Sequence, residues 1–141
     1  MKVVDANVLL YAVNSDTPHH RTARDWLDHA LNGEQTVGFT WLALLAFTRI
    51  STHPGIFARP LTVTEAFDVT EGWLERPGAV IVDPTHRHPA ILRGIIEPLG
   101  TAGNLLNDAH LAAVAVEHGA EVVTFDADFT RFAGVKVGRL G

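Results

Sequence analysis

Blocks of apolar and polar residues alternate along this chain in a way that predicts strands and helices in turn. The segment Lys2 to Asp5 contains Val3-Val4 and predicts a first strand, and the apolar stretch Val8 to Val13 predicts a short helix after it. A longer helix is predicted from Pro18 to Leu31, because its apolar residues recur at helical spacing. Asn32-Gly33 is a typical end for such a helix.

The rest of the chain continues this alternation. Further strands are predicted at Thr36 to Thr40, Ala79 to Val82, Glu121 to Phe125 and Val135 to Val137. Further helices are predicted at Trp41 to Thr52, Thr62 to Leu74, Pro84 to Leu99 (interrupted or ended near Pro98) and Asn107 to His118. Thr62 and Glu65 have the spacing of a capping box. Strands and helices in this order predict an α/β fold with a central, mainly parallel sheet.

Composition narrows the class of protein. A length of 141 residues with 47% hydrophobic content supports a single domain spanning residues 1–141. The chain has no cysteine, which excludes disulfides, thiolate metal sites and a cysteine nucleophile. No apolar run approaches the roughly 18 to 20 residues that cross a bilayer, and the N-terminal run is too short for a signal peptide. We therefore expect a soluble, cytoplasmic protein with no membrane contact.

Four aspartates carry the candidate chemistry. Asp5, Asp126 and Asp128 follow predicted strands, and Asp108 opens the alanine-rich predicted helix. Carboxylates in such places converge at one edge of a parallel sheet, where hard divalent cations with oxygen ligands are bound. This pattern predicts a metal-dependent phosphodiesterase.

Each aspartate also has a purely structural interpretation. Asp5 is a good N-cap for the helix that follows it, and Asp108 lies where the helix dipole favours a negative charge. Asp126 and Asp128 suit an Asx-turn after the strand. The four together are more informative than any one alone.

The net charge of -5 argues against a general electrostatic attraction to nucleic acid. It is compatible with a nuclease, because a bound Mg²⁺ or Mn²⁺ reverses the local field where a phosphate would lie. Basic residues that would guide an RNA backbone, or simply carry surface charge, are Arg49, Arg59, Arg87, Arg93 and Arg131.

Three segments resemble the acidic motifs of PIN-domain ribonucleases, and more narrowly of the VapC toxins of bacterial toxin-antitoxin pairs. The segments are Val4-Asp5-Ala6-Asn7-Val8-Leu9-Leu10-Tyr11, Asn107-Asp108-Ala109-His110-Leu111-Ala112 and Thr124-Phe125-Asp126-Ala127-Asp128-Phe129. The resemblance covers almost the whole chain, in order and in spacing.

The resemblance implies a three-layer α/β/α domain whose acidic pocket binds Mg²⁺ or Mn²⁺ and hydrolyses RNA with a metal-activated water, leaving 5′-phosphate and 3′-hydroxyl ends. By position, Asp5, Asp108 and Asp126 would be the catalytic metal ligands, directly or through water, and Asp128 a fourth ligand or an outer contributor. Asn7 and Asn107 would orient these groups, or act only as turn and cap residues.

The chain departs from the family pattern at one position. PIN domains usually carry a glutamate in a Glu-x-x-Arg setting after the second strand, and this chain has Ala46 there while keeping Arg49. The site is thus one carboxylate short, which should weaken metal binding, above all of a second ion. Among the scattered histidines, only His53 lies where a compensating ligand is conceivable. A catalytically weakened PIN-fold protein that binds RNA or protein is therefore the alternative function.

Other enzyme classes fit less well. Asp126-Ala127-Asp128-Phe129-Thr130 matches the Asp-x-Asp-x-Thr signature of haloacid-dehalogenase-like phosphohydrolases, but only eleven residues follow Thr130. That is too few for the remaining catalytic segments of that fold. The only serines, Ser15 and Ser51, lack the Gly-x-Ser-x-Gly setting of a hydrolase nucleophile. No Gly-rich phosphate loop is present.

The resemblance also implies a partner protein. VapC-like toxins are held by a small VapB-type antitoxin, whose C-terminal segment wraps the toxin and often places a basic side chain in the acidic pocket. The apolar segment around Trp41, Leu42, Leu45 and Phe47 would bind that segment, form a homodimer, or lie in the core of the monomer.

Overall fold

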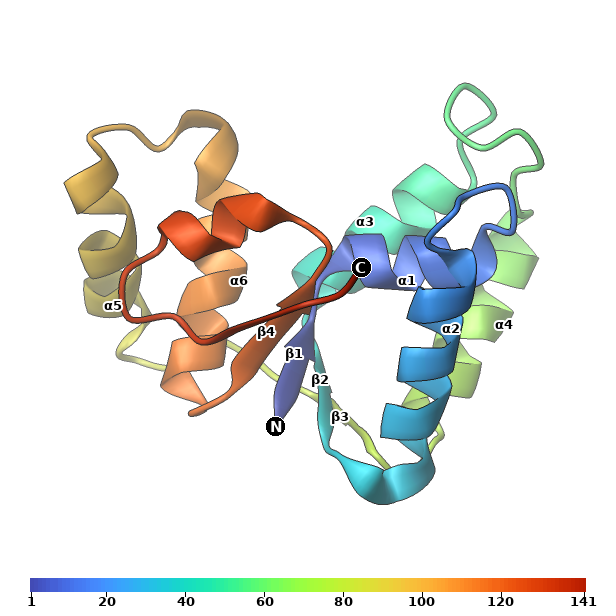
Figure 1. Cartoon of the computed structure of the whole chain (residues 1–141), viewed down its shortest axis with the longest axis horizontal. Coiled ribbons are helices and arrows are strands. Elements are labelled where there is room, and N and C mark those ends of the chain that lie inside the picture. The colour runs from blue at the N-terminus through green and yellow to red at the C-terminus, as the bar shows by residue number, and fades with distance from the viewer.

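Five parallel strands form the centre of the molecule. The computed structural model describes all 141 residues. The strands, in chain order, are β1 (Lys2–Val4), β2 (Val37–Phe39), β3 (Ala79–Ile81), β4 (Glu121–Thr124) and β5 (Val137–Arg139). They lie in the order β3-β2-β1-β4-β5, and every neighbouring pair is parallel. Figure 1 labels the first four strands of this order. All five carboxyl ends therefore reach the same edge of the sheet, with the end of β1 in the middle.

Helices cover both faces of this sheet, which confirms the predicted three-layer arrangement. The helices are α1 (Ala6–Val13), α2 (His20–His29), α3 (Trp41–Ser51), α4 (Val63–Leu74), α5 (His88–Ile96) and α6 (Leu106–Glu117). The first four pack on one face, and α5 and α6 on the other (Figure 1). No helix is long and apolar enough to cross a membrane.

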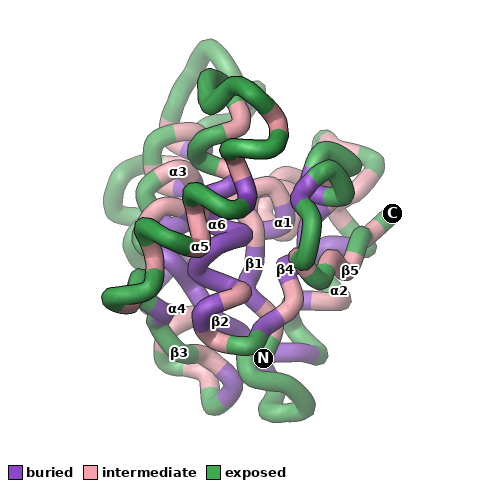
Figure 2. Tube along the Cα trace, turned by 90° about the vertical axis from the view of Figure 1, so that its left-hand side faces the viewer, coloured by how far each residue is buried: buried purple, intermediate pink, exposed green.

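The buried residues form two apolar clusters, one on each side of the sheet. Val4 belongs to the cluster under α1 to α4, whereas its neighbour Val3 belongs to the cluster under α5 and α6. Successive side chains of a strand point to opposite faces, so a strand buried on both faces is apolar throughout. Figure 2 shows this burial running through β1, β4 and α6, while the connecting loops stay exposed.

Local signals in the sequence account for several helix ends. Asp5 caps α1, since its Oδ1 accepts a hydrogen bond from the backbone N–H of Ala6 at 2.7 Å. The predicted capping box of Thr62 and Glu65 is present at the start of α4. Gly119 follows α6 with a φ of 63°, a left-handed conformation that glycine adopts without strain.

Two element boundaries were predicted wrongly. The helix expected from Pro84 begins only at His88, with Pro89 in its first turn, whereas the expected interruption near Pro98 is confirmed, because the α-helix ends at Ile96 and a 3₁₀ turn follows. The last strand is Val137–Arg139 rather than Val135 to Val137. Its register is set by pairing with β4, where Val137 lies opposite Val122.

A buried polar network joins α5 to α6, and the sequence did not predict it. The Glu117 side chain is fully buried and accepts hydrogen bonds from the backbone N–H and the hydroxyl group of Thr85, at 2.7 and 2.6 Å. His88 Nδ1 lies 2.5 Å from the other Glu117 oxygen, and His88 Nε2 lies 2.9 Å from His110 Nδ1. The network fastens the start of α5 to both ends of α6.

The charge states in this network follow from their surroundings. Burial raises the pKa of Glu117, but the hydrogen bonds from Thr85 and His88 lower it more, so the pKa lies below its usual value of 4.5. Burial and the neighbouring His88 lower the pKa of His110 below 6.5. Ionised Glu117 therefore stabilises the fold above about pH 4.5, and protonation of His110 works against the fold in acid.

Replacing Glu117 by Gln should lower the free energy of unfolding by about 2 kcal/mol at pH 7, because hydrogen bonds to a buried carboxylate are lost. Denaturant unfolding at several pH values measures this loss, which should shrink as the pH falls below the usual pKa of a glutamate. The exposed Glu71→Gln on α4 is the control and should change nothing. An equal loss at every pH would contradict the assigned charge.

Candidate active site

The fold gathers the four predicted aspartates at the carboxyl edge of the sheet. Asp5 directly follows β1, and Asp126 lies two residues beyond the end of β4. These two strands are neighbours, with Val4 opposite Val123, so the residues after them lie side by side. Asp108 is the third residue of α6. The negative charges of Asp5, Asp126 and Asp128 raise the pKa of the Asp108 carboxyl group, so the four side chains form one electrostatic cluster.

The hydroxyl group of Thr124 holds this cluster together. It donates to Asp5 Oδ2 at 2.7 Å and accepts from the backbone N–H of Asp126 at 2.9 Å. It also accepts from Asn7 Nδ2 at 3.2 Å. One donation and two acceptances are the full capacity of a hydroxyl group. Thr124 is completely buried, so these bonds fix Asp5 and Asp126 relative to each other.

Sequence reasoning missed the role of Thr124, although a signal was present. Thr124 is the one polar residue in the run Val122-Val123-Thr124-Phe125, and it precedes Asp126 by two positions. Asn7, which was expected to orient the aspartates or to act only as a turn or cap residue, contacts none of them directly and reaches the site through Thr124. Its side chain also accepts from the backbone N–H of Phe125 at 3.3 Å, so it links α1 to the end of β4.

Burial, together with the crowding of like charges, raises the pKa of two of the carboxyl groups. Burial raises the pKa of Asp5, although hydrogen bonds from Thr124 and the backbone of Ala6 oppose this, and the charge of Asp126 adds to it. Burial, followed by the charges of Asp5, Asp126 and Asp128, raises the pKa of Asp108 to about 6. No protein group donates a hydrogen bond to Asp108. A bound cation would offset the repulsion between the carboxylates and would take the place of the hydrogen-bond donor that Asp108 lacks.

A hollow of about 180 Å³ opens beside Asp5 and Asp108. One wall is carboxylate and the other is apolar; the lining residues are Asp5, Ala6, Leu42, Ala43, Ala46, Asn107, Asp108 and Leu111. Ala46 thus faces the acidic residues, in the position where the family pattern has a glutamate. Asn107 lines the hollow but is exposed and makes no side-chain hydrogen bond. Asp126 and Asp128 lie outside the lining.

The site offers only oxygen ligands, the kind that Mg²⁺ and Mn²⁺ prefer. No three acidic or histidine side chains are close enough together to surround one ion by themselves. This suits Mg²⁺, which is usually held by one or two carboxylates and keeps several waters. His53 does not reach the hollow: it is exposed beyond α3, and its Nδ1 accepts from the backbone N–H of Gly55.

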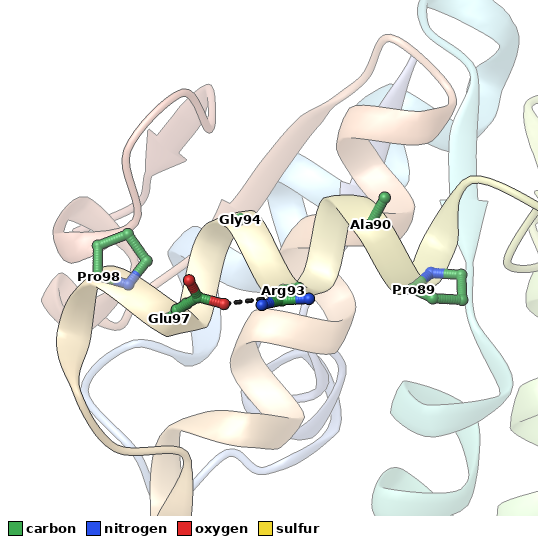
Figure 3. Close-up of a pocket in the computed structure, with 6 residues that line it drawn as sticks. All are labelled: Pro89, Ala90, Arg93, Gly94, Glu97 and Pro98. Carbon is green, nitrogen blue, oxygen red and sulfur yellow. Dashed lines mark hydrogen bonds and ion pairs between the residues drawn. The ribbon is translucent and has the colours of Figure 1, made fainter.

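A larger hollow, of about 460 Å³, lies elsewhere and carries no comparable chemistry. It follows the outer surface of α5, where Ala90, Gly94 and Pro98 leave space beside the ion pair of Arg93 and Glu97 (Figure 3). That pair satisfies the only charges in the hollow. The acidic site is therefore the better candidate for catalysis.

Comparison with known proteins agrees with this geometry. The family model described as "PIN domain" matches residues 2–135. Ribonuclease VapC37 of Mycobacterium tuberculosis is 54% identical over 136 residues, which cover 96% of this chain and 94% of the relative. The chain belongs to the PIN-domain family, among the VapC ribonucleases.

Solved structures of VapC-type proteins have the same fold. The VapBC2 complex of Rickettsia felis bound to a promoter DNA fragment matches with a TM-score of 0.73, at 18% identity, over 99% of this chain and 98% of that one. VapC20 of Mycobacterium tuberculosis, described as a sarcin-ricin loop cleaving toxin, matches with a TM-score of 0.64 at 17% identity, over 96% and 99%. At these identities the likeness concerns the fold.

Replacing Thr124 by Val should reduce ribonuclease activity by about 10-fold to 100-fold, the usual effect of losing a group that orients a metal ligand. Valine has nearly the same shape, but it lacks the hydroxyl group that donates to Asp5 and accepts from Asn7 and the backbone of Asp126. Cleavage rates at saturating Mn²⁺ measure the effect. Thr124→Ser keeps the hydroxyl group and should retain most of the activity; an equal loss in both variants would show that the methyl group matters instead.

Replacing Asp108 by Asn should stabilise the metal-free protein at neutral pH. The raised pKa of Asp108 means that ionisation costs folding free energy as the pH rises from 3.8 towards 6. The full displacement would correspond to about 3 kcal/mol, and solvent screening at a half-exposed carboxyl group reduces the expected gain to about 1 kcal/mol.

Thermal unfolding in EDTA tests this expectation. The melting temperature of Asp108→Asn should exceed that of the wild type by about 3 to 5 °C at pH 7.5 and match it near pH 4. Added Mg²⁺ should stabilise the wild type more than the variant. Asp28→Asn, an exposed change on α2, is the control. A variant less stable than the wild type at pH 7.5 would contradict the assigned repulsion.

Proposed function

We propose that this chain is a metal-dependent endoribonuclease toxin of the VapC type, with Asp5, Asp108 and Asp126 as catalytic metal ligands, either directly or through water molecules. Asp128 contributes from the outer side of the cluster. The observation that carries the proposal is the pKa of Asp108, raised to about 6 by burial and by three neighbouring carboxylates. A protein keeps such repulsion at a site where a cation is to be bound.

The chain's own residues position the reaction. Thr124 orients the carboxylate of Asp5 and holds the backbone of Asp126, and Asn7 supports Thr124 from α1. Asp108 adds an oxygen ligand that no protein donor occupies. A bound Mg²⁺ or Mn²⁺ would polarise the scissile phosphate and lower the pKa of a water molecule for in-line attack. RNA cleavage would take place in the cytoplasm, where both substrate and antitoxin are made.

Ala46 favours a site with one metal ion. No aspartate or glutamate occurs between Glu34 and Glu65, so no residue of α3 replaces the missing carboxylate. The same observation supports a second candidate function, a PIN-fold protein that binds RNA or protein and has lost most of its activity. The two functions differ in whether the three remaining aspartates suffice for turnover.

A VapB-type antitoxin is the expected protein partner, as in the VapBC2 complex of Rickettsia felis. The apolar segment of α3 is divided between core and surface. Phe47 is buried in the core, whereas Trp41 and Leu45 are 50% and 63% exposed. Exposed large apolar residues of this kind mark a contact surface. They suit either an antitoxin segment or a second copy of the chain.

Cleavage of total RNA and transfer RNA by the purified, antitoxin-free chain tests the proposal. Cutting should require Mn²⁺ or Mg²⁺, stop in EDTA, and fall at least about 100-fold in Asp5→Asn, because one metal ligand is lost. Expression without an antitoxin should arrest growth, and Asp5→Asn should relieve the arrest.

An Ala46→Glu variant separates the two candidate functions. If the wild type cuts RNA, the three aspartates suffice and the ribonuclease is established. If a folded wild type does not cut with either metal but Ala46→Glu does, the chain is the weakened, binding form. The control is Gln35→Glu, which adds the same charge before the amino end of β2, at the opposite edge of the sheet, and should restore nothing.

A further inference from the structure

A second hollow continues the acidic one along the surface of α3. It has a volume of about 410 Å³, and its lining residues are Leu42, Leu45, Ala46, Arg49 and Asn107. Leu42, Ala46 and Asn107 also line the acidic hollow. The two hollows therefore adjoin, and together we call them the α3 groove, with Asp5 and Asp108 at one end and Arg49 at the other.

Helix geometry explains why these side chains share a groove. Leu42, Leu45, Ala46 and Arg49 occupy positions i, i+3, i+4 and i+7 of α3, which lie on one face of a helix. From Ala46 to Arg49 the helix advances by less than one turn of about 5.4 Å, which is within the reach of a single nucleotide. The apolar side chains lie between the carboxylates at one end and the guanidinium group at the other.

Arg49 is the free cation of this surface. Arg59 and Arg93 are paired with Asp16 and Glu97, and Arg87 donates to the backbone carbonyl of Glu117. Arg131, the other candidate for guiding RNA, does not line the groove. Arg49 is exposed and has no hydrogen bond or ion pair from its side chain. Its charge is available to a ligand that lies in the groove.

We propose that the α3 groove holds one nucleotide of single-stranded RNA next to the phosphate that is cut. The base of this nucleotide packs on Leu42 and Leu45, and its distal phosphate binds Arg49. The proposal rests on the function proposed above, because it takes the scissile phosphate to lie at Asp5 and Asp108. An unpaired strand is required, since a base in a duplex cannot turn its face onto an apolar wall.

Ala46 belongs to both parts of the α3 groove. It lines each of the two hollows, and a longer side chain at this position would take up space where they adjoin. At position 46 the chain thus has an apolar side chain where the family pattern has a carboxylate, so the lining of the groove is apolar there. A negative side chain there would also repel the phosphate that follows the base.

Binding of a short, fluorescently labelled single-stranded RNA to the full chain tests the proposal without relying on cleavage. The measurement is fluorescence anisotropy in EDTA at several salt concentrations, in an Asp5→Asn background, with a gel to confirm that the RNA stays intact. Arg49→Gln should weaken binding about threefold to fivefold. The slope of log affinity against log salt should fall by about 0.7, the value for one lost phosphate contact.

Three further variants distinguish charge from shape. Arg49→Lys keeps the charge and should retain the salt slope. Ala46→Leu should weaken binding by a similar factor without changing the slope, because it fills the nucleotide space and leaves Arg49 in place. Lys136→Gln removes an exposed cation next to the start of β5, at the opposite edge of the sheet, and should change neither quantity.

The RNA-binding experiment can fail independently of the RNA-cleavage experiment that tests the proposed function. If Arg49→Gln binds RNA as tightly as its parent and with the same salt slope, the groove is not the path of the strand and the proposal is wrong. The same holds if Arg49→Gln weakens binding of the antitoxin alone, since the groove then holds protein. Failure of the ribonuclease itself would be seen as metal-independent or absent cutting with RNA binding intact.

Discussion

A single buried hydroxyl group, that of Thr124, connects the segments that carry the residues of the acidic site. Thr124 ends β4, and through its side chain it reaches Asp5 after β1, Asn7 in α1 and the backbone of Asp126. β1 and β4 are adjacent parallel strands, so their carboxyl ends are side by side whatever residues follow them. The strand pairing brings the carboxylates near one another, and Thr124 fixes the carboxylate of Asp5 and the backbone that leads to Asp126.

This arrangement works against the stability of the metal-free fold. Four carboxylates lie within reach of one another's charge, and only those of Asp5 and Asp126 accept hydrogen bonds from protein donors. Asp108 has none and shows the largest consequence, a pKa of about 6. The stabilising polar groups lie elsewhere: on the far side of α6, the buried Glu117 is satisfied by Thr85 and His88. Helix α6 thus carries Asp108, a carboxylate without a hydrogen-bond donor, near its start and Glu117, a carboxylate with several donors, at its end.

Local signals explain how much of this could be predicted from the sequence. Apolar runs and caps predicted the alternation of strands and helices, and the acidic motifs predicted which carboxylates meet. What failed depends on contacts between distant segments. The register of β5 is set by β4, and the link between His88 and His110 requires α5 to lie against α6. No spacing along the chain encodes either of these contacts, so the histidines looked scattered.

The presence of Ala46 instead of a glutamate affects both ends of the α3 groove, the acidic end at Asp108 and the basic end at Arg49. A carboxylate at this position would add a metal ligand, but it would also place a negative charge and a longer side chain between Asp108 and Arg49. Alanine gives up that ligand and leaves an apolar surface that continues to a free cation. Binding energy for the substrate would then come from a base and a neighbouring phosphate, and less from the metal. Interactions away from the reacting phosphate can contribute to catalysis by holding the substrate in position.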